Sequence, residues 1–360
     1  MIDVRSIASE IQPLEAEWLQ RAQNHLDQLT KPPGSLGKLE HLAKQLVAIR
    51  KEMTPRLEKK AVIVMAADHG VCDEGISQYP QAVTGQMILN FLQGGAAVNV
   101  LARQAGADVF CYDIGSKADI PNEQLHSNKI RNGTGNIAIE PAMSEQEAEL
   151  AIMRGVSLVH RLVADGYTCF ATGEMGIGNT TVSSALLCVL LEKTPSEIVG
   201  FGTGIDATKK LHKELVVQRA IHRFESAKIK RHEERIPYAL ELLAQLGGLE
   251  IAGLVGVILG CAYHRCPIVI DGFISTTAAV VAAHIAPNAV QYMVPSHLSH
   301  EAGHRHALAH LELQPMLHMD MRLGEGTGAV LCFPLIDVAI AIICEMATFE
   351  SAGVSGELDS

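Results

Sequence analysis

Residues 167–187 contain the stretch that decides the fold. It opens with the apolar run Tyr167–Thr172 and continues as Gly173-Glu174-Met175-Gly176-Ile177-Gly178-Asn179-Thr180-Thr181, before a helical pattern over 182–187. A strand, a glycine-rich loop and a helix are therefore predicted in succession. The glycines allow positive φ and close approach to a ligand, and Thr180 or Asn179 is suited to cap the helix. The free N–H groups at that helix start would form an anion site.

The alternative for this loop is a tight turn that binds nothing. Glu174 argues against that alternative, because a lone charge has no evident purpose in a mere turn. The loop is not a phosphate-binding loop of the Walker A type, since no Gly-Lys-Ser/Thr follows it.

Short apolar runs recur on both sides of this stretch and alternate with longer helical patterns. The alternation predicts an α/β fold, with a Rossmann-like, mostly parallel six-stranded sheet covered by helices on both faces. Ligands of such sheets bind beyond the carboxyl ends of the strands. The candidate strands are Ala61–Ala67, Asp108–Ile114, Tyr167–Thr172, Glu197–Phe201, Pro267–Asp271 and Val290–Val294.

The two ends of the chain are helical in pattern. Leu36, Leu39, Leu42 and Leu46 recur at helical spacing after a proline-glycine turn, and residues 335–352 are helical again. We therefore predict a small helical domain from residues 1–58 with 335–360, and a large α/β catalytic domain over residues 59–334.

Composition excludes several classes of protein. The chain has 360 residues, of which 48% are apolar and 19% charged, as in globular proteins. A net charge of −11 argues against nucleic-acid binding, which needs clustered Lys and Arg. The 8 cysteines lack disulfide-framework or zinc spacing, so we expect mostly buried free thiols and a cytoplasmic location.

Residues 1–14 contain no signal-peptide stretch. The apolar stretches Ile251–Tyr263 and Ala278–Ile285 are too short to span a membrane, and we predict core helices there.

A second glycine loop covers Gly202-Thr203-Gly204-Ile205-Asp206-Ala207 and matches the dinucleotide pattern G-x-G-x-x-A. The pattern also needs a strand ending in an acid about 20 residues further on, and none is found there. We interpret the loop as a site of close backbone approach. Lys213 follows on a helix, and it either reaches an anion or is a solvated surface lysine, the commoner fate.

Glu325 lies between glycines in the stretch Arg322-Leu323-Gly324-Glu325-Gly326-Thr327-Gly328, ahead of an apolar helix. A carboxylate at the mouth of an apolar segment is suited to a raised pKa and to general-base catalysis. The equally weighted alternative is a carboxylate that favours the helix dipole.

A third group of polar side chains follows the first strand. Asp68 and His69 lie at its end and either touch a substrate or hold the loop. The segments 77–80 and 83–87 then supply polar and soft apolar groups, a mixture that suits a flat aromatic ligand.

The segment His300-Glu301-Ala302-Gly303-His304 matches the zinc-protease pattern H-E-x-x-H. Gly303 weakens a helix between the two histidines, and no third ligand is evident. We therefore expect no metal. We interpret most of the histidines in this region as surface, loop or subunit-contact residues, namely those among His297, His300, His304, His306 and His310.

Taken together, the loops resemble one family, the nicotinate-nucleotide–dimethylbenzimidazole phosphoribosyltransferases of cobalamin nucleotide-loop assembly. The matching pieces follow the family's order along nearly the whole chain, and the last two are specific in combination. They are residues 31–37, 67–71, 83–84 with 86–87, 94–97, 173–181 and 322–328.

The resemblance implies a Rossmann-like sheet with a small helical domain, a homodimer, and no metal or organic cofactor. It implies transfer of the phosphoribosyl group of nicotinate mononucleotide to 5,6-dimethylbenzimidazole, giving α-ribazole 5′-phosphate and nicotinate. Glu325 falls on the family's catalytic base, and Glu174 and Lys213 fall on active-site positions. The substrate-binding residues we expect are Asp68, Ser77, Tyr79, Gln86, Met87, Gly176, Ile177, Gly178, Asn179, Thr180, Gly202, Thr203, Gly204, Leu323 and Gly324.

The chemistry of that reaction fits these residue types. The pyridinium leaving group needs no protonation, whereas the incoming benzimidazole must lose a proton, for which Glu325 is our candidate. Glu174 would stabilise the oxocarbenium-like sugar. The phosphate would bind at residues 176–180 with help from Lys213. Attack opposite the leaving group inverts the anomeric carbon.

Three other functions stay open at this stage: a dinucleotide-dependent oxidoreductase using residues 202–207, a zinc hydrolase using residues 300–304, and a nucleotide-binding protein without catalysis on the same fold. The sequence does not decide which aromatic base is preferred.

Overall fold

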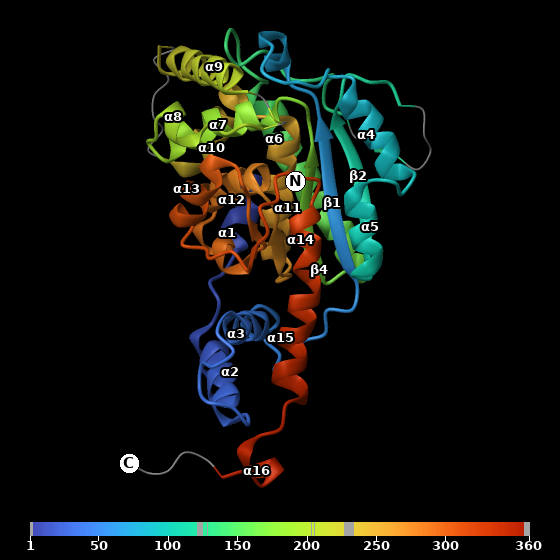
Figure 1. The fold of residues 1–360 in the computed structure, drawn as a ribbon, viewed down its shortest axis with the longest axis vertical. Coiled ribbons are helices and arrows are strands. Elements are labelled where there is room, and N and C mark those ends of the chain that lie inside the picture. The colour runs from blue at the N-terminus through green and yellow to red at the C-terminus, as the bar shows by residue number, and fades with distance from the viewer. Residues whose placement is uncertain are drawn as a thin grey trace.

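The computed structural model describes residues 3–120, 125–127, 129–202, 204, 206–226 and 234–355. A six-stranded sheet in the order β3-β2-β1-β4-β5-β6 forms its centre, and every neighbouring pair is parallel (Figure 1). A second, two-stranded sheet pairs β7 with β8. The strands are β1 (Lys60–Ala67), β2 (Ala107–Gly115), β3 (His126–Ser127), β4 (Cys169–Met175), β5 (Ile268–Ile270), β6 (Met293–Pro295), β7 (His297–Leu298) and β8 (Leu317–His318).

Helices fill most of the remaining described chain. The first eight are α1 (Val4–Glu10), α2 (Ala16–Gln28), α3 (Lys38–Arg50), α4 (Val83–Leu92), α5 (Ala97–Gln104), α6 (Glu145–Ala164), α7 (Asn179–Leu190) and α8 (Pro195–Ile198). The others are α9 (Ala207–Ser226), α10 (Arg235–Leu246), α11 (Leu249–Tyr263), α12 (Phe273–Ile285), α13 (Ala302–His310), α14 (Thr327–Leu331), α15 (Phe333–Glu345) and α16 (Phe349–Ala352), with 3₁₀ turns η1 (Gly70–Glu74) and η2 (Pro287–Tyr292).

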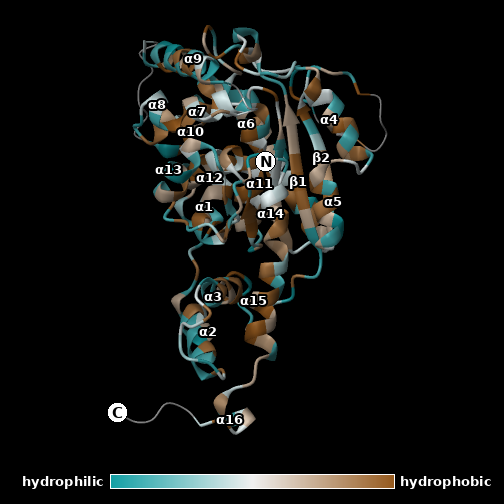
Figure 2. Cartoon of the chain, in the orientation of Figure 1, coloured by the Kyte–Doolittle hydropathy of each residue, from teal (hydrophilic) through white to brown (hydrophobic). Residues whose placement is uncertain are grey.

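The central strand β1 divides two hydrophobic cores. Ile63 and Met65 point into a core shared with α6, α7, α11 and α12, whereas Val62 and Val64 point into one shared with α3, α5, α14 and α15. All eight residues of β1 are buried, as expected for a parallel strand covered on both faces. Figure 2 shows hydrophobic residues along β1 and β2. The predicted α/β architecture with a parallel sheet and helices on both sides is thus confirmed.

Five of the six predicted strands form, with shifted ends, and one prediction is wrong. Residues 197–201 are not a strand, because Pro195 at the first turn and a capping box between Thr194 and Glu197 start the short helix α8. The predicted strand Val290–Val294 is displaced to β6, since Pro287 opens the 3₁₀ turn η2. The remaining member of the sheet is the two-residue edge strand β3, which was not predicted.

Helices α2, α3 and α15 pack together beyond the amino ends of the strands (Figure 1). Helix α1 instead packs on α11 and α6, with Val4 and Ile7 in the core of the α/β unit. We keep the division into two domains as a proposal in which α2, α3 and α15 form the small one.

Helices α14 and α15 form one apolar stretch, Thr327–Glu345, of 19 residues. By length and composition alone it is sufficient to cross a membrane, and half of its most apolar window is buried inside the protein. Core helices of globular proteins can have the same length and composition. The two stretches singled out from the sequence are the buried helices α11 and α12, as predicted.

The eight cysteines are all free. Six of them are buried, whereas Cys72 is half-buried and Cys344 is exposed, so the prediction of mostly buried thiols holds for six.

Candidate active site

A cavity of about 420 Å³ opens beyond the carboxyl ends of β4 and β5. Its wall combines the end of β4, the loop before α7, the start of α12, and the loops before α13 and α14. Of the residues predicted from the sequence, it brings together Ser77, Tyr79, Met87, Glu174, Gly176, Ile177, Gly178, Asn179, Thr180, Gly202, Leu323, Gly324 and Glu325.

Glu174 lies on β4 itself rather than in the loop that follows, since the strand continues to Met175. Asn179 donates a hydrogen bond to its Oε2 atom, and the backbone N–H of Glu325 donates to Oε1 at 3.4 Å. Burial raises the pKa of Glu174 to about 8, and the nearby carboxylates Asp271 and Glu250 add to the shift. At neutral pH this side chain therefore carries a proton in most molecules.

The loop that carries Glu325 is fixed by Asp271, at the end of β5. The Asp271 carboxylate accepts hydrogen bonds from the backbone N–H groups of Gly326, at 3.1 Å, and Ala329, at 2.9 Å. Asp271, rather than Glu325, is thus the carboxylate at the start of α14. Burial raises the pKa of Glu325, and its Oε2 atom has no hydrogen-bond partner among the described residues. The geometry leaves Glu325 available to a ligand.

The glycine-rich loop is shorter than the sequence suggested. Helix α7 begins at Asn179, and its N-cap is Gly178 at φ +98°, so neither Asn179 nor Thr180 caps it by its side chain. The loop rests on His69, because a Cβ at Gly176 would lie 3.0 Å from His69 Nε2. The helix start still presents its N–H dipoles to the cavity.

Lys213 is buried, only 1% exposed, and the alternative of a solvated surface lysine is wrong. Its Nζ atom donates a hydrogen bond to Thr180 Oγ1 at 2.8 Å, which places it at the edge of the cavity. Burial lowers the pKa of Lys213 to about 8, while the charge of Glu301 opposes that shift.

Three of the predicted binding residues that the structure describes do not line this cavity. Asp68 and Gln86 line a different hollow beside α4, and the Asp68 carboxylate accepts a hydrogen bond from the backbone of Lys117 at 2.8 Å. Gly204 lies outside the cavity and accepts a hydrogen bond from Gln78. Thr203 lies outside the described residues.

Several cavity residues were missed from the sequence. They follow β5, β6 or β8, and none of them was predicted to bind a substrate. These residues are Phe273, Ser275, His297, Ser299, Glu301 and Arg322. The signal available was the Asp271-Gly272 pair after a predicted strand, the position where ligands bind in such sheets.

The H-E-x-x-H segment does not have the geometry of a zinc site. Helix α13 begins at Ala302, so His300 precedes it and does not share a helical face with His304. The Nδ1 atom of His304 accepts a hydrogen bond from Ser299 N–H at 2.8 Å, and its Nε2 lies 2.9 Å from Thr276 Oγ1. Within the described residues, no three His, Cys, Asp or Glu side chains are placed to hold a metal ion.

The dinucleotide pattern at residues 202–207 also lacks its structural context. It follows the short helix α8 and a loop rather than a strand of the sheet. The structure therefore gives no support to the oxidoreductase alternative.

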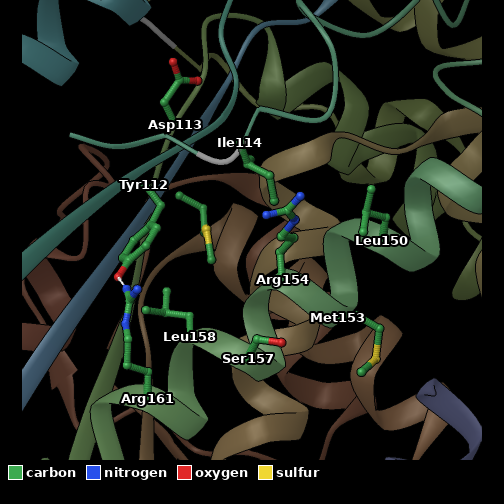
Figure 3. A pocket seen from close by; sticks show the side chains of 10 residues that line it. Tyr112, Asp113, Ile114, Leu150, Met153, Arg154, Ser157, Leu158 and Arg161 are labelled. Atoms are coloured by element: carbon green, nitrogen blue, oxygen red, sulfur yellow. Dashed lines mark hydrogen bonds between the residues drawn. The ribbon is translucent and has the colours of Figure 1, made fainter. Parts of the chain in front are cut away.

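A second cavity, of about 310 Å³, lies between β2 and α6 (Figure 3). Arg154, Ser157 and Arg161 reach it from one face of α6, and Arg161 donates a hydrogen bond to the Tyr112 hydroxyl. None of the predicted site residues lines it.

Comparison with known proteins places the chain in a family. A family model described as phosphoribosyltransferase matches residues 11–354. The chain belongs to this phosphoribosyltransferase family. A relative from Chloroflexus aurantiacus, named nicotinate-nucleotide–dimethylbenzimidazole phosphoribosyltransferase, is 48% identical over 98% of both chains. A protein of the same name from Desulforamulus reducens is 49% identical over 96% of this chain and 97% of its own.

Solved structures of this phosphoribosyltransferase family agree with the fold. The crystal structure of CobT from Thermus thermophilus superposes with a TM-score of 0.89 at 44% identity, covering 94% of this chain and 99% of that one. A second structure from the same organism carries the nicotinate-nucleotide–dimethylbenzimidazole phosphoribosyltransferase name and superposes with a TM-score of 0.88 at 42% identity, covering 95% of this chain and 100% of that one.

Proposed function

We propose that this protein transfers the phosphoribosyl group of nicotinate mononucleotide to 5,6-dimethylbenzimidazole, yielding α-ribazole 5′-phosphate and nicotinate. Relatives that carry the name of this activity match the chain along nearly its full length. The observation that carries the proposal is the pair of buried acids, Glu174 and Glu325, at one cavity beside a helix start.

Glu325 acts as the general base. Attack by one ring nitrogen of the benzimidazole leaves a cation unless the proton on the other nitrogen is removed. The unpartnered Oε2 of Glu325 supports this role, and its raised pKa brings the carboxylate closer to the basicity that such a transfer needs. The leaving nicotinate departs from a pyridinium and needs no acid.

Glu174 faces the sugar. Its pKa of about 8 means that it is mainly protonated in the absence of a nearby cation. The positive pyridinium, and then the oxocarbenium-like sugar, would lower that pKa and favour the carboxylate when it is needed. Approach of the base from the side opposite to the leaving group inverts the anomeric carbon from β to α.

The 5′-phosphate binds at the start of α7, where Gly176, Gly178 and Thr180 line the cavity and Lys213 lies behind Thr180. The helix dipole and the lysine charge both favour an anion there. Tyr79, Met87 and Leu323 provide apolar surface for the aromatic base, as a flat ring requires.

We also propose a cytoplasmic homodimer that uses no metal or organic cofactor and binds neither nucleic acid nor membrane. The outer side of α15 supports a contact with a second copy, because Val338 on it is 45% exposed within an apolar helix. Light scattering would test the dimer, and a monomer at micromolar concentration would reject it.

The activity is tested by incubating metal-free protein with nicotinate mononucleotide and 5,6-dimethylbenzimidazole. We expect α-ribazole 5′-phosphate and nicotinate in equal amounts by chromatography, with no effect of a chelator. Absence of product with these substrates, and with adenine and other benzimidazoles as acceptors, would reject the proposed transfer.

A further inference from the structure

The second cavity, between β2 and α6, lies where α6 packs on α11 rather than closely on the sheet. A Cβ at Gly155 would lie 2.1 Å from the Gly253 carbonyl oxygen, and one at Gly256 would lie 1.8 Å from that of Ile152. The glycines thus let the two helix backbones touch. Strand β2 is near the edge of the sheet, with only the short β3 beyond it. A space of about 310 Å³ is left between the outer side of α6 and β2 (Figure 3).

One side of α6 forms a polar wall of this cavity. Leu150, Arg154, Ser157 and Arg161 line it and follow one another at intervals of four, three and four residues. That spacing aligns side chains along one side of a helix. Because two of the four side chains carry guanidinium groups and one carries a hydroxyl, this wall is positively charged and rich in hydrogen-bond donors.

The remaining surface of the cavity is mostly apolar. It is formed by Met65, Ile114, Met153, Leu158 and the ring of Tyr112. Met65 lies on the central strand β1 and is only 1% exposed, so the cavity reaches from the helix surface to the middle of the sheet. Thioethers and an aromatic ring make favourable contacts with a flat aromatic ligand.

Arg161 is held at this cavity by Tyr112, because its guanidinium donates a hydrogen bond to the Tyr112 hydroxyl. Its guanidinium carbon lies 5.8 Å from the centroid of the Tyr112 ring. Among the described residues, no carboxylate forms an ion pair with Arg161. The bond to Tyr112 uses one of the five N–H donors of the guanidinium, so the others are available to a ligand.

Asp113 is the acid that lines the cavity, and its charge is already satisfied. Its carboxylate accepts hydrogen bonds from the backbone N–H and the hydroxyl of Ser116, both at 2.8 Å, and it pairs with Lys129 at 3.2 Å. Figure 3 shows this carboxylate turned away from the two arginines. Asp113 therefore does not compete with an anion for Arg161.

The alternative is that the arginines of α6 are ordinary solvated charges, the commoner fate of such residues. Arg154 is half-buried, however, and the cavity beside it extends to a buried strand. A largely apolar cavity with a few polar groups at one wall is the usual form of a small-molecule site.

We propose that the second cavity binds a small aromatic carboxylate, with the carboxylate on the guanidinium of Arg161 and the ring against Met65 and Met153. The planar guanidinium fork matches a carboxylate, and the ring displaces water from apolar side chains. This cavity shares no lining residue with the cavity of Glu174 and Glu325, so the inference does not depend on the proposed function.

Calorimetric titration of the full-length protein with 2-naphthoate tests the site, and 2-naphthamide is a neutral control of similar shape. We expect the amide to bind at least about tenfold more weakly, since a hydrogen bond between two charged groups contributes about that factor. Arg161→Met should weaken binding of 2-naphthoate by a similar factor. Arg21→Met on α2, which removes an arginine outside the cavity, should leave it unchanged.

A second pair of variants locates the bound molecule, because the first cavity also has apolar surface. Ser157→Phe fills the second cavity and should abolish binding of 2-naphthoate, whereas Tyr79→Ala in the first cavity should leave its affinity unchanged. Ser157 is exposed, so its variant also serves if Arg161→Met does not fold.

Three results would overturn the inference. They are absence of 2-naphthoate binding to wild type, equal affinities for the acid and the amide, and binding that persists in Ser157→Phe but is lost in Tyr79→Ala. A crystal soaked with 2-naphthoate gives an independent answer: density between β2 and Arg161 supports the site, and density only in the first cavity rejects it.

Discussion

The Nε2 atom of His69 lies 2.8 Å from Oε1 of Glu250, and neither side chain is exposed to solvent. His69 follows β1 and Glu250 lies in the first turn of α11, so the pair joins two elements directly below Gly176. The remaining side-chain atoms of the pair, His69 Nδ1 and Glu250 Oε2, have no partner among the described residues. The glycine-rich loop therefore packs on a buried, polar pair of side chains, His69 and Glu250.

Removing one member of this pair should destabilise the protein strongly. We expect Glu250→Ala to lower the free energy of unfolding by roughly 3–5 kcal/mol, because His69 stays buried without a partner. The double variant His69→Phe with Glu250→Leu should recover much of that loss. Denaturant unfolding measures both, and a loss below about 1 kcal/mol for Glu250→Ala would contradict the importance of the contact.

Glu325→Gln should keep substrate binding and lower kcat about 10²–10⁴-fold, because the amide cannot accept the benzimidazole proton. Glu312→Gln is a matched control, since both residues have positive φ, +63° and +56°, and Glu312 lies on a turn after α13. Steady-state kinetics with both substrates provide the measurement. Unchanged turnover in Glu325→Gln would remove this residue from the base role.

Glu174 should make the protein less stable as the pH rises. Its folded-state pKa of about 8 lies above the ordinary value of 4.5, so between these two values the folded state holds a proton that the unfolded chain has released. The free energy of unfolding therefore falls with pH in that window, by up to about 1.4 kcal/mol per pH unit. Glu174→Gln should flatten this dependence in urea unfolding between pH 5 and 8. A dependence as steep as in wild type would show that other groups cause it.

Gly324→Ala should reduce both stability and activity. Gly324 has φ +87°, and a Cβ there would lie 2.2 Å from Glu174 Oε1. Gly106→Ala is the control, because φ is +63° and no atom lies within 4 Å of its Cβ. We expect the control to lose about 1–2 kcal/mol from backbone strain alone, and Gly324→Ala to lose more and to disturb Glu174. Equal losses in thermal unfolding, with full activity, would show that the loop adapts.

Much of the fold could be predicted, because β1 and β4 are largely apolar runs with a glycine within three residues of their ends, and helical patterns separate them. The strand predicted at 197–201 failed because Thr194, Pro195 and Glu197 together favour a helix start, a local signal that outweighs the short apolar run. The edge strand β3 has two residues, too few for any periodicity to show.

In the candidate site, the two acids between glycines were found because their sequence context is unusual. Glu174 and Glu325 line the same cavity, and their roles remain predictions. His297 and Glu301 were missed as binding residues because β5 and β6 have only three residues each. The order β4-β5-β6 in the sheet brings the loops after these strands beside the glycine-rich loop after β4, and such short strands do not reveal that order in the sequence. Asp68 lines the hollow beside α4 instead, because the sequence places it after β1 but does not tell which hollow its side chain enters.

The helical stretch that starts two residues after Glu325 has a mechanical consequence. Nineteen residues at 1.5 Å each make a rod about 28 Å long, rooted at the active-site loop and ending among α2 and α3. A tilt of about one degree at the Glu325 end of a rod of that length moves its far end by about 0.5 Å. In the same way, a movement of about 0.5 Å at the far end tilts the Glu325 end by only about one degree. A movement of the distant helices α2 and α3 is therefore transmitted, reduced in size, to the loop that carries Glu325, the proposed general base.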